Sequence, residues 1–108
     1  MMKMYIKTNP EISFIKFIKL VTPVASFKSL TGKEYLVTSL NDYTMQLVRK
    51  SSGTPWSMDL EQVLKAYQEL TEFKTENFRS YVPRTHSPAL GLLLHLELLQ
   101  PHSSRLIK

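Results

Sequence analysis

The chain has 108 residues, of which 43% are hydrophobic and 21% charged, and its formal net charge is +5 at pH 7. This length suits one domain, and the composition is typical of a globular protein rather than a disordered one. Because the chain has no cysteine, disulfides, thiol nucleophiles and cysteine-containing zinc sites are excluded.

The first predicted element is a helix over residues 10–21. Asn9 suits the N-cap, and Pro10 suits the first helical position, whose N–H would be unpaired in any case. Apolar residues then follow the helical spacing i, i+3, i+4 and i+7, at Phe14, Phe17, Ile18 and Val21. Pro23 ends the helix, and residues 1–8 before it are expected to be a flexible end.

The middle of the chain, from 27 to 49, predicts a β-hairpin. Two stretches of strand-forming residues, 33–40 and 43–50, are preceded by a turn at Thr31-Gly32 and separated by one at Asn41-Asp42. A turn at 51–53 leads to a short third strand over 54–58. Pro55 confines that strand to a sheet edge, because proline cannot donate to a ladder.

The clearest helix begins at Asp59 and runs to about residue 70. Asp59 and Gln62 have the spacing of a capping box, and one apolar stripe follows at Leu60, Val63, Leu64 and Tyr67. An aromatic segment over 71–82 comes next, in which Thr75 can cap a brief helix. Pro83 ends that segment.

The last predicted helix, 87–100, is apolar around most of its circumference, since seven of its fourteen residues are leucine. Ser87 suits the cap, Pro88 the first position and Pro101 the end. A bilayer span needs about 20 apolar residues, so this helix is either a core helix or a core helix that also serves an interface. In the first case the segments 10–30 and 71–86 would wrap it completely. Its surplus apolar side predicts a two-fold homodimer contact through Leu90, Leu93, Leu94 and Leu98.

The elements occur in the order α-β-β-(β)-α-α-α. Strands in the middle and helices at both ends predict an α+β fold, in which a small antiparallel hairpin or three-stranded meander packs against helices. We expect one domain over 1–108, with flexible ends at 1–8 and 102–108.

Catalytic and metal-binding motifs are missing from the sequence. Three glycines do not make a phosphate-cradling loop, and His86, His95 and His102 are widely spaced. General acid–base catalysis needs positioned groups that the sequence does not show. We therefore expect no enzyme, no metal site and no cofactor.

One candidate anion site comprises Arg79, Arg84, His86 and Ser87, at the start of the leucine-rich helix. A helix N-terminus offers free N–H groups and a positive dipole end, and arginine adds bidentate geometry for phosphate or carboxylate. The alternative is that Arg84 pairs with a glutamate and His86 is merely exposed.

A second candidate is a basic strip of Lys33, Arg49 and Lys50 beside Trp56. Basic residues next to an exposed aromatic ring suit single-stranded nucleic acid, although the lone tryptophan of a small domain usually lies in the core. No known nucleic-acid-binding motif accompanies the strip.

The sequence favours a non-catalytic binding or adaptor protein that self-associates as a homodimer and accepts a protein partner. Two alternatives stay open: a nucleic-acid-binding protein using the basic strip, and a protein with a small-molecule or anion pocket. The first ten residues show no signal-peptide pattern, so we expect a cytoplasmic location and no membrane partner.

Overall fold

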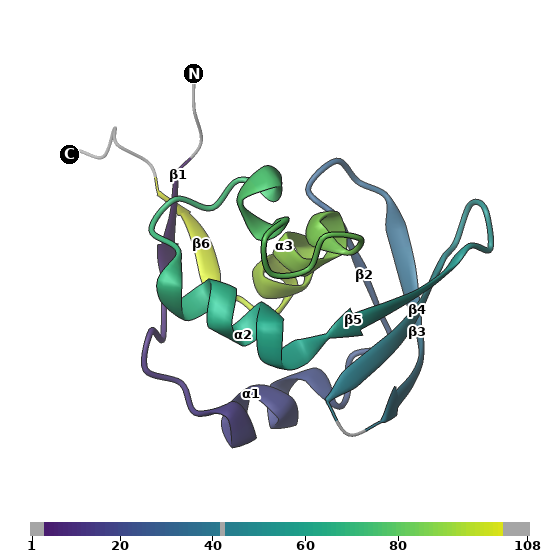
Figure 1. The fold of residues 1–108 in the computed structure, drawn as a ribbon, viewed down its shortest axis with the longest axis horizontal. Helices are drawn as coiled ribbons and strands as arrows, with labels where there is room; N and C mark the ends of the chain where they lie inside the picture. Colours follow the sequence, from purple (N-terminus) through teal and green to yellow (C-terminus); the bar gives the residue numbers. More distant parts are fainter. Residues whose placement is uncertain (1–3, 42, 103–108) are drawn as a thin grey trace.

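The computed structural model describes residues 4–41 and 43–102. Within these ranges the chain forms two antiparallel sheets, three α-helices and one 3-10 helix (Figure 1). The fold is therefore α+β, as predicted. The elements are β1 (Met4–Lys7), α1 (Phe14–Val21), β2 (Ser26–Lys28), β3 (Glu34–Asn41), β4 (Thr44–Arg49), β5 (Pro55–Asp59), α2 (Leu60–Glu69), the 3-10 helix η1 (Thr75–Phe78), α3 (His86–His95) and β6 (Leu99–His102).

The larger sheet has the strand order β2-β3-β4-β5. The predicted hairpin is confirmed as β3 and β4, and the third strand lies at an edge as β5. Alternate β4 residues, Met45 and Leu47, are buried against the helices, as the period of two requires. Gly32 and Gly53 have φ values of 92° and 71°, which glycine adopts without strain in the turns before β3 and β5. Asp42 of the predicted second turn lies outside the described residues.

The smaller sheet joins the two ends of the described chain. β1 pairs antiparallel with β6 over four residue pairs, from Met4↔His102 to Lys7↔Leu99. The prediction of flexible ends is therefore wrong for residues 4–7 and 102. Pairing satisfies backbone hydrogen bonds that neither segment could satisfy alone, and Pro101 is tolerated because both strands of a two-stranded sheet are edges. The rest of both ends, 1–3 and 103–108, lies outside the described residues.

Helix α1 begins four residues later than predicted. Its N-cap is Ser13, whose hydroxyl oxygen accepts a hydrogen bond from the Lys16 backbone N–H at 3.2 Å. Asn9 lies outside the helix, and its backbone N–H donates to the Tyr67 hydroxyl at 3.0 Å, which ties that segment to α2. Phe17 and Val21 are buried, in agreement with the predicted stripe.

Helix α2 follows the prediction closely. The Asp59 carboxylate caps it by accepting from the backbone N–H groups of Glu61 and Gln62 at 3.0 and 3.3 Å. All four residues of the predicted stripe are buried. One of them, Tyr67, donates its hydroxyl hydrogen to the Leu98 carbonyl oxygen at 2.9 Å, so the helix is tied to the turn before β6.

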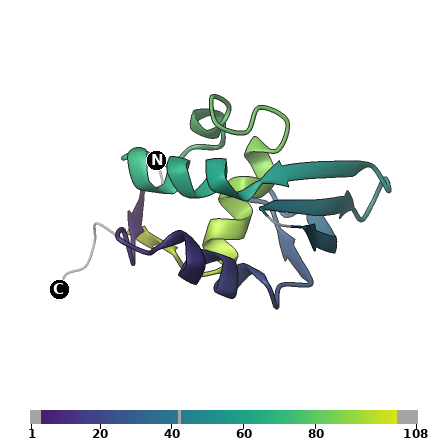
Figure 2. The same ribbon diagram turned by 60° about the horizontal axis from the view of Figure 1, so that its bottom comes forward.

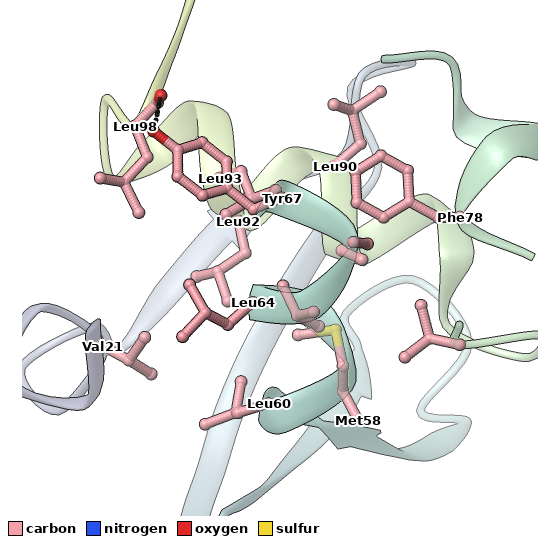
Figure 3. Packing of buried hydrophobic residues seen from close by; sticks show 14 of the residues in the cluster. Val21, Met58, Leu60, Leu64, Tyr67, Phe78, Leu90, Leu92, Leu93 and Leu98 are labelled. Carbon is pink, nitrogen blue, oxygen red and sulfur yellow. Dashed lines mark hydrogen bonds between the residues drawn. The ribbon is translucent and has the colours of Figure 1, made fainter. Parts of the chain in front are cut away.

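Helix α3 runs through the middle of the molecule, with the larger sheet on one side and the smaller on the other (Figures 1 and 2). Every residue from Pro88 to Leu93 is buried. Figure 3 shows Leu90 beside Phe78 of η1 and Leu93 beside Tyr67 of α2. Both sheets and the 71–85 segment therefore surround the helix that the sequence marks as most apolar.

Both predicted ends of the leucine-rich helix are wrong. Thr85 is the N-cap, and it makes no side-chain capping bond, while Ser87 lies inside the first turn. The helix ends at His95 because Glu97 adopts the left-handed conformation, with φ at 63°. Residues Leu99–His102 are then extended and pair with β1.

Candidate functional site

A cavity of about 470 Å³ lies between β2 and α3. We call it the β2–α3 cavity. Apolar walls come from Phe27, Leu30 and Leu94, and Lys28 and His95 are among the polar residues of the lining. Ser26, Ser29, Glu34 and Gly91 complete the lining. A pocket of this size, with apolar walls and few polar groups, is the usual form of a small-molecule site.

The open edge of the larger sheet forms one wall of this cavity. The Val37 N–H donates to the Ala25 carbonyl and the Ser29 N–H to the Lys33 carbonyl, both at 2.8 Å. Because hydrogen-bonded pairs alternate along an antiparallel ladder, the backbone groups of Ser26 point away from β3. They face the edge that β2 leaves open.

The opposite wall is one face of α3. Gly91, Leu94 and His95 have the spacing i, i+3 and i+4, which places them on the same side of a helix. A Cβ atom at Gly91 would lie 2.8 Å from the Ser29 Cα and still closer to the Lys28 carbonyl oxygen. The helix therefore approaches the strand backbone directly, and the absence of a side chain at Gly91 fixes the depth of the cavity.

The mouth of the β2–α3 cavity is basic. Glu34, the one acidic residue of the lining, has its carboxylate 3.6 Å from the Lys50 ammonium group. Lys28 and His95 are exposed, and neither forms an ion pair with a described carboxylate. The stretch from Ile12 to Lys33, both included, contains four lysines and no acidic residue. An anionic group would therefore meet a favourable potential at this mouth.

A second hollow lies along the free edge of β5, on another side of the sheet. Two cavities of about 320 and 230 Å³ share Ser57 and Arg84 in their lining and therefore adjoin; we call the two together the β5 groove. Its far wall is the segment 81–85 that precedes α3. Tyr81 on this wall donates its hydroxyl hydrogen to the Glu69 carboxylate at 2.9 Å, and this bond raises the pKa of the phenol.

The residues of the predicted anion site do not line one common hollow. Only Arg84 of the four lines either hollow. The His86 ring nitrogen Nδ1 contacts the Pro83 carbonyl oxygen at 2.8 Å, and Ser87 is half-buried within the helix. Arg79 follows η1 and is exposed. Arg84 therefore lines a hollow at the edge of β5. The sequence had instead predicted an anion site for it at the start of the leucine-rich helix.

The predicted basic strip is divided between the two faces of the sheet. Arg49 and Trp56 are both half-buried. The Arg49 Nε atom and the Trp56 indole nitrogen are buried and have no hydrogen-bond partner among the described residues. Lys50 pairs with Glu34, and Lys33 is exposed in the turn before β3. The structure does not present these four residues as one exposed surface. Nucleic-acid binding stays a prediction.

The predicted dimer contact assumed that one apolar side of the leucine-rich helix is exposed, and this assumption does not hold. Leu90, Leu93 and Leu98 are buried inside the chain itself, because the 71–85 segment and both sheets cover the helix. Leu94 is half-buried and lines the β2–α3 cavity. Dimerisation stays a prediction, but these residues do not supply an exposed surface for it.

Sequence reasoning missed both hollows. The i, i+3, i+4 spacing of Gly91, Leu94 and His95 could have indicated that these residues share one helix face. It does not reveal which strand lies opposite that face and closes the cavity. Within the described residues no group of three histidine, aspartate or glutamate side chains could hold a metal ion. None of the described helices is both long enough and apolar enough to cross a bilayer.

No protein-family model, no curated protein and no solved structure matches this chain.

Proposed function

We propose that this chain is a non-catalytic binding protein that holds a small amphipathic anion in the β2–α3 cavity. The observation that carries the proposal is the lining itself, in which apolar walls lie next to the exposed Lys28 ammonium group and the exposed His95 imidazole. An alkyl chain would fit against Phe27 and Leu94, and its acidic head group would lie at the basic mouth. The volume of about 470 Å³ lies within the range of small-ligand pockets.

The lining supports binding rather than catalysis. The cavity has no cysteine and no second carboxylate to work with Glu34, and Glu34 is held by Lys50. Ser29 is buried, and its hydroxyl accepts from the Lys33 N–H and bonds to the Thr31 hydroxyl. A nucleophile needs an adjacent base to activate it, and His95 packs toward Phe27, with ring centroids 6.4 Å apart.

Decanoate and its neutral counterpart 1-decanol test this proposal by calorimetry. We expect decanoate to bind the folded protein more tightly than 1-decanol. Lys28→Gln should weaken decanoate binding by about 1 kcal/mol, roughly fivefold in Kd, because an exposed charge is screened by solvent. The same substitution should leave 1-decanol binding unchanged.

Two further variants locate the ligand. Leu94→Asp places a carboxylate on the apolar wall and should abolish decanoate binding, while Lys33→Gln removes a nearby exposed lysine that does not line the cavity. Lys33→Gln should therefore bind decanoate nearly as the unaltered chain does. Equal losses in Lys28→Gln and Lys33→Gln, or no decanoate binding at all, would contradict the proposal.

A further inference from the structure

We propose that the β5 groove is a second binding site, in which Arg84 and the free edge of β5 hold the carboxylate or phosphate group of an anionic ligand. The groove shares no lining residue with the β2–α3 cavity. The proposal therefore stands independently of the function proposed above.

The backbone of β5 offers a hydrogen-bond donor to the groove. Arg49 N–H donates to the Thr54 carbonyl at 3.0 Å, and Leu60 N–H to the Tyr43 carbonyl at 2.8 Å. These two bonds and the register Gln46↔Ser57 place Ser57 at a non-hydrogen-bonded position of the ladder. The Ser57 N–H therefore points away from β4, toward the open edge that the groove follows.

The side chains of the groove add hydrogen-bond donors, and one acceptor among them, the Gln46 side-chain oxygen, is already bonded. The Ser57 hydroxyl donates to the Gln46 Oε1 atom at 2.8 Å, so that carbonyl is occupied and the amide NH₂ of Gln46 remains as a donor. The larger of the two cavities has no acidic residue in its lining. In the smaller one, the Asp59 carboxylate is already engaged in capping α2.

Arg84 supplies the charge. It lines both cavities, it is exposed, and it forms no ion pair with a carboxylate of the described residues. The guanidinium group presents several N–H donors in a planar fork, which matches two oxygens of a carboxylate or phosphate. The Ser57 carbonyl points to the same open edge as its N–H, and the donors available to a carboxylate or phosphate are the Ser57 N–H, the Gln46 amide NH₂ and the Arg84 guanidinium.

Titration of the ¹⁵N-labelled protein with inorganic phosphate and with acetate, followed by NMR, tests the site. Sodium chloride at equal ionic strength is the reference. We expect saturable shifts of the Ser57 backbone amide signal and the Arg84 side-chain signal with phosphate, with acetate or with both anions. Chloride should shift neither signal. The two anions distinguish a phosphate site from a carboxylate site. Identical shifts with chloride would show general screening and overturn the proposal.

Two arginine variants separate this site from the one expected at the start of α3. Arg84→Gln should weaken anion binding at least tenfold, whereas Arg79→Gln, which removes an exposed arginine outside the groove, should leave it within twofold. Arg84→Lys keeps the charge without the fork, and its affinity should fall between these two. Because Arg84 is exposed, signals remote from the groove should stay in place. Equal losses in Arg79→Gln and Arg84→Gln would refute a specific site.

Discussion

Gly91→Ala tests whether α3 must approach β2 without a side chain between them. An added Cβ would lie 2.8 Å from the Ser29 Cα and 3.0 Å from the Lys28 carbonyl carbon, whereas ordinary contacts begin at 3.4 Å. Both partners are backbone atoms of β2 and the turn after it, so no side chain can rotate out of the way. Helix and strand would have to separate.

Two opposing free-energy changes decide the size of the effect. Alanine in a helix interior is favoured over glycine by about 1 kcal/mol. Overpacking costs about 1–3 kcal/mol, and the upper end applies here because the contacts are with backbone. We therefore expect a net loss of about 2 kcal/mol in the free energy of unfolding, or roughly 10 °C in Tm for a domain of this size.

Urea unfolding followed by the fluorescence of Trp56 measures this loss. Ser87→Ala is the matched control, because Ser87 lies on the same helix, is half-buried and has no described side-chain hydrogen bond. It should change stability by less than about 0.5 kcal/mol. If Gly91→Ala proved as stable as Ser87→Ala, helix propensity would outweigh the contact, and the close approach would have no energetic importance.

Two other predictions concern α2 and the segment that follows it. Asp59→Ala removes the cap and should lower the free energy of unfolding by about 1 kcal/mol in urea titrations. Lys65→Ala, on the exposed face of the same helix, is the control and should change this free energy by less than about 0.5 kcal/mol. Equal effects of the two substitutions would refute the capping role. Tyr81 donates to Glu69, and this bond raises the phenol pKa above its ordinary value of 10.0. The bond therefore stabilises the fold fully below pH 10.0, and that contribution is lost as pH rises through the folded-state pKa. Unfolding between pH 9 and 11, about the tyrosine pKa, should show a shallower fall for Tyr81→Phe, and an unchanged fall would contradict the link.

Local patterns predicted much of the secondary structure. The alternation through Met45 and Leu47 indicated a half-buried strand, and Pro55 indicated an edge. The cap at Asp59 and the stripe through Tyr67 marked α2. In each case the signal comes from residues within one turn or one pleat of each other, and the final packing agrees with it.

The helix ends show where such signals stop being sufficient. Asn9 and Ser13 are both good capping residues, but only Ser13 caps α1, while the Asn9 backbone is bonded to Tyr67, far along the chain. Likewise, the apolar run after His95 could continue a helix. Pairing with β1 makes the extended form more favourable there, because it satisfies the backbone of both ends at once.

By itself, the sequence determined the α+β class, the meander and the apolar character of α3. Only the tertiary structure decided that α3 would be covered within its own chain, and which sheet edges would stay open beside Lys28 and Arg84. The physical reason is that periodicity reports which face of an element is apolar, but not which element covers it. Both hollows lie where a strand meets a segment distant in sequence, so their chemistry depends on packing that no local pattern contains.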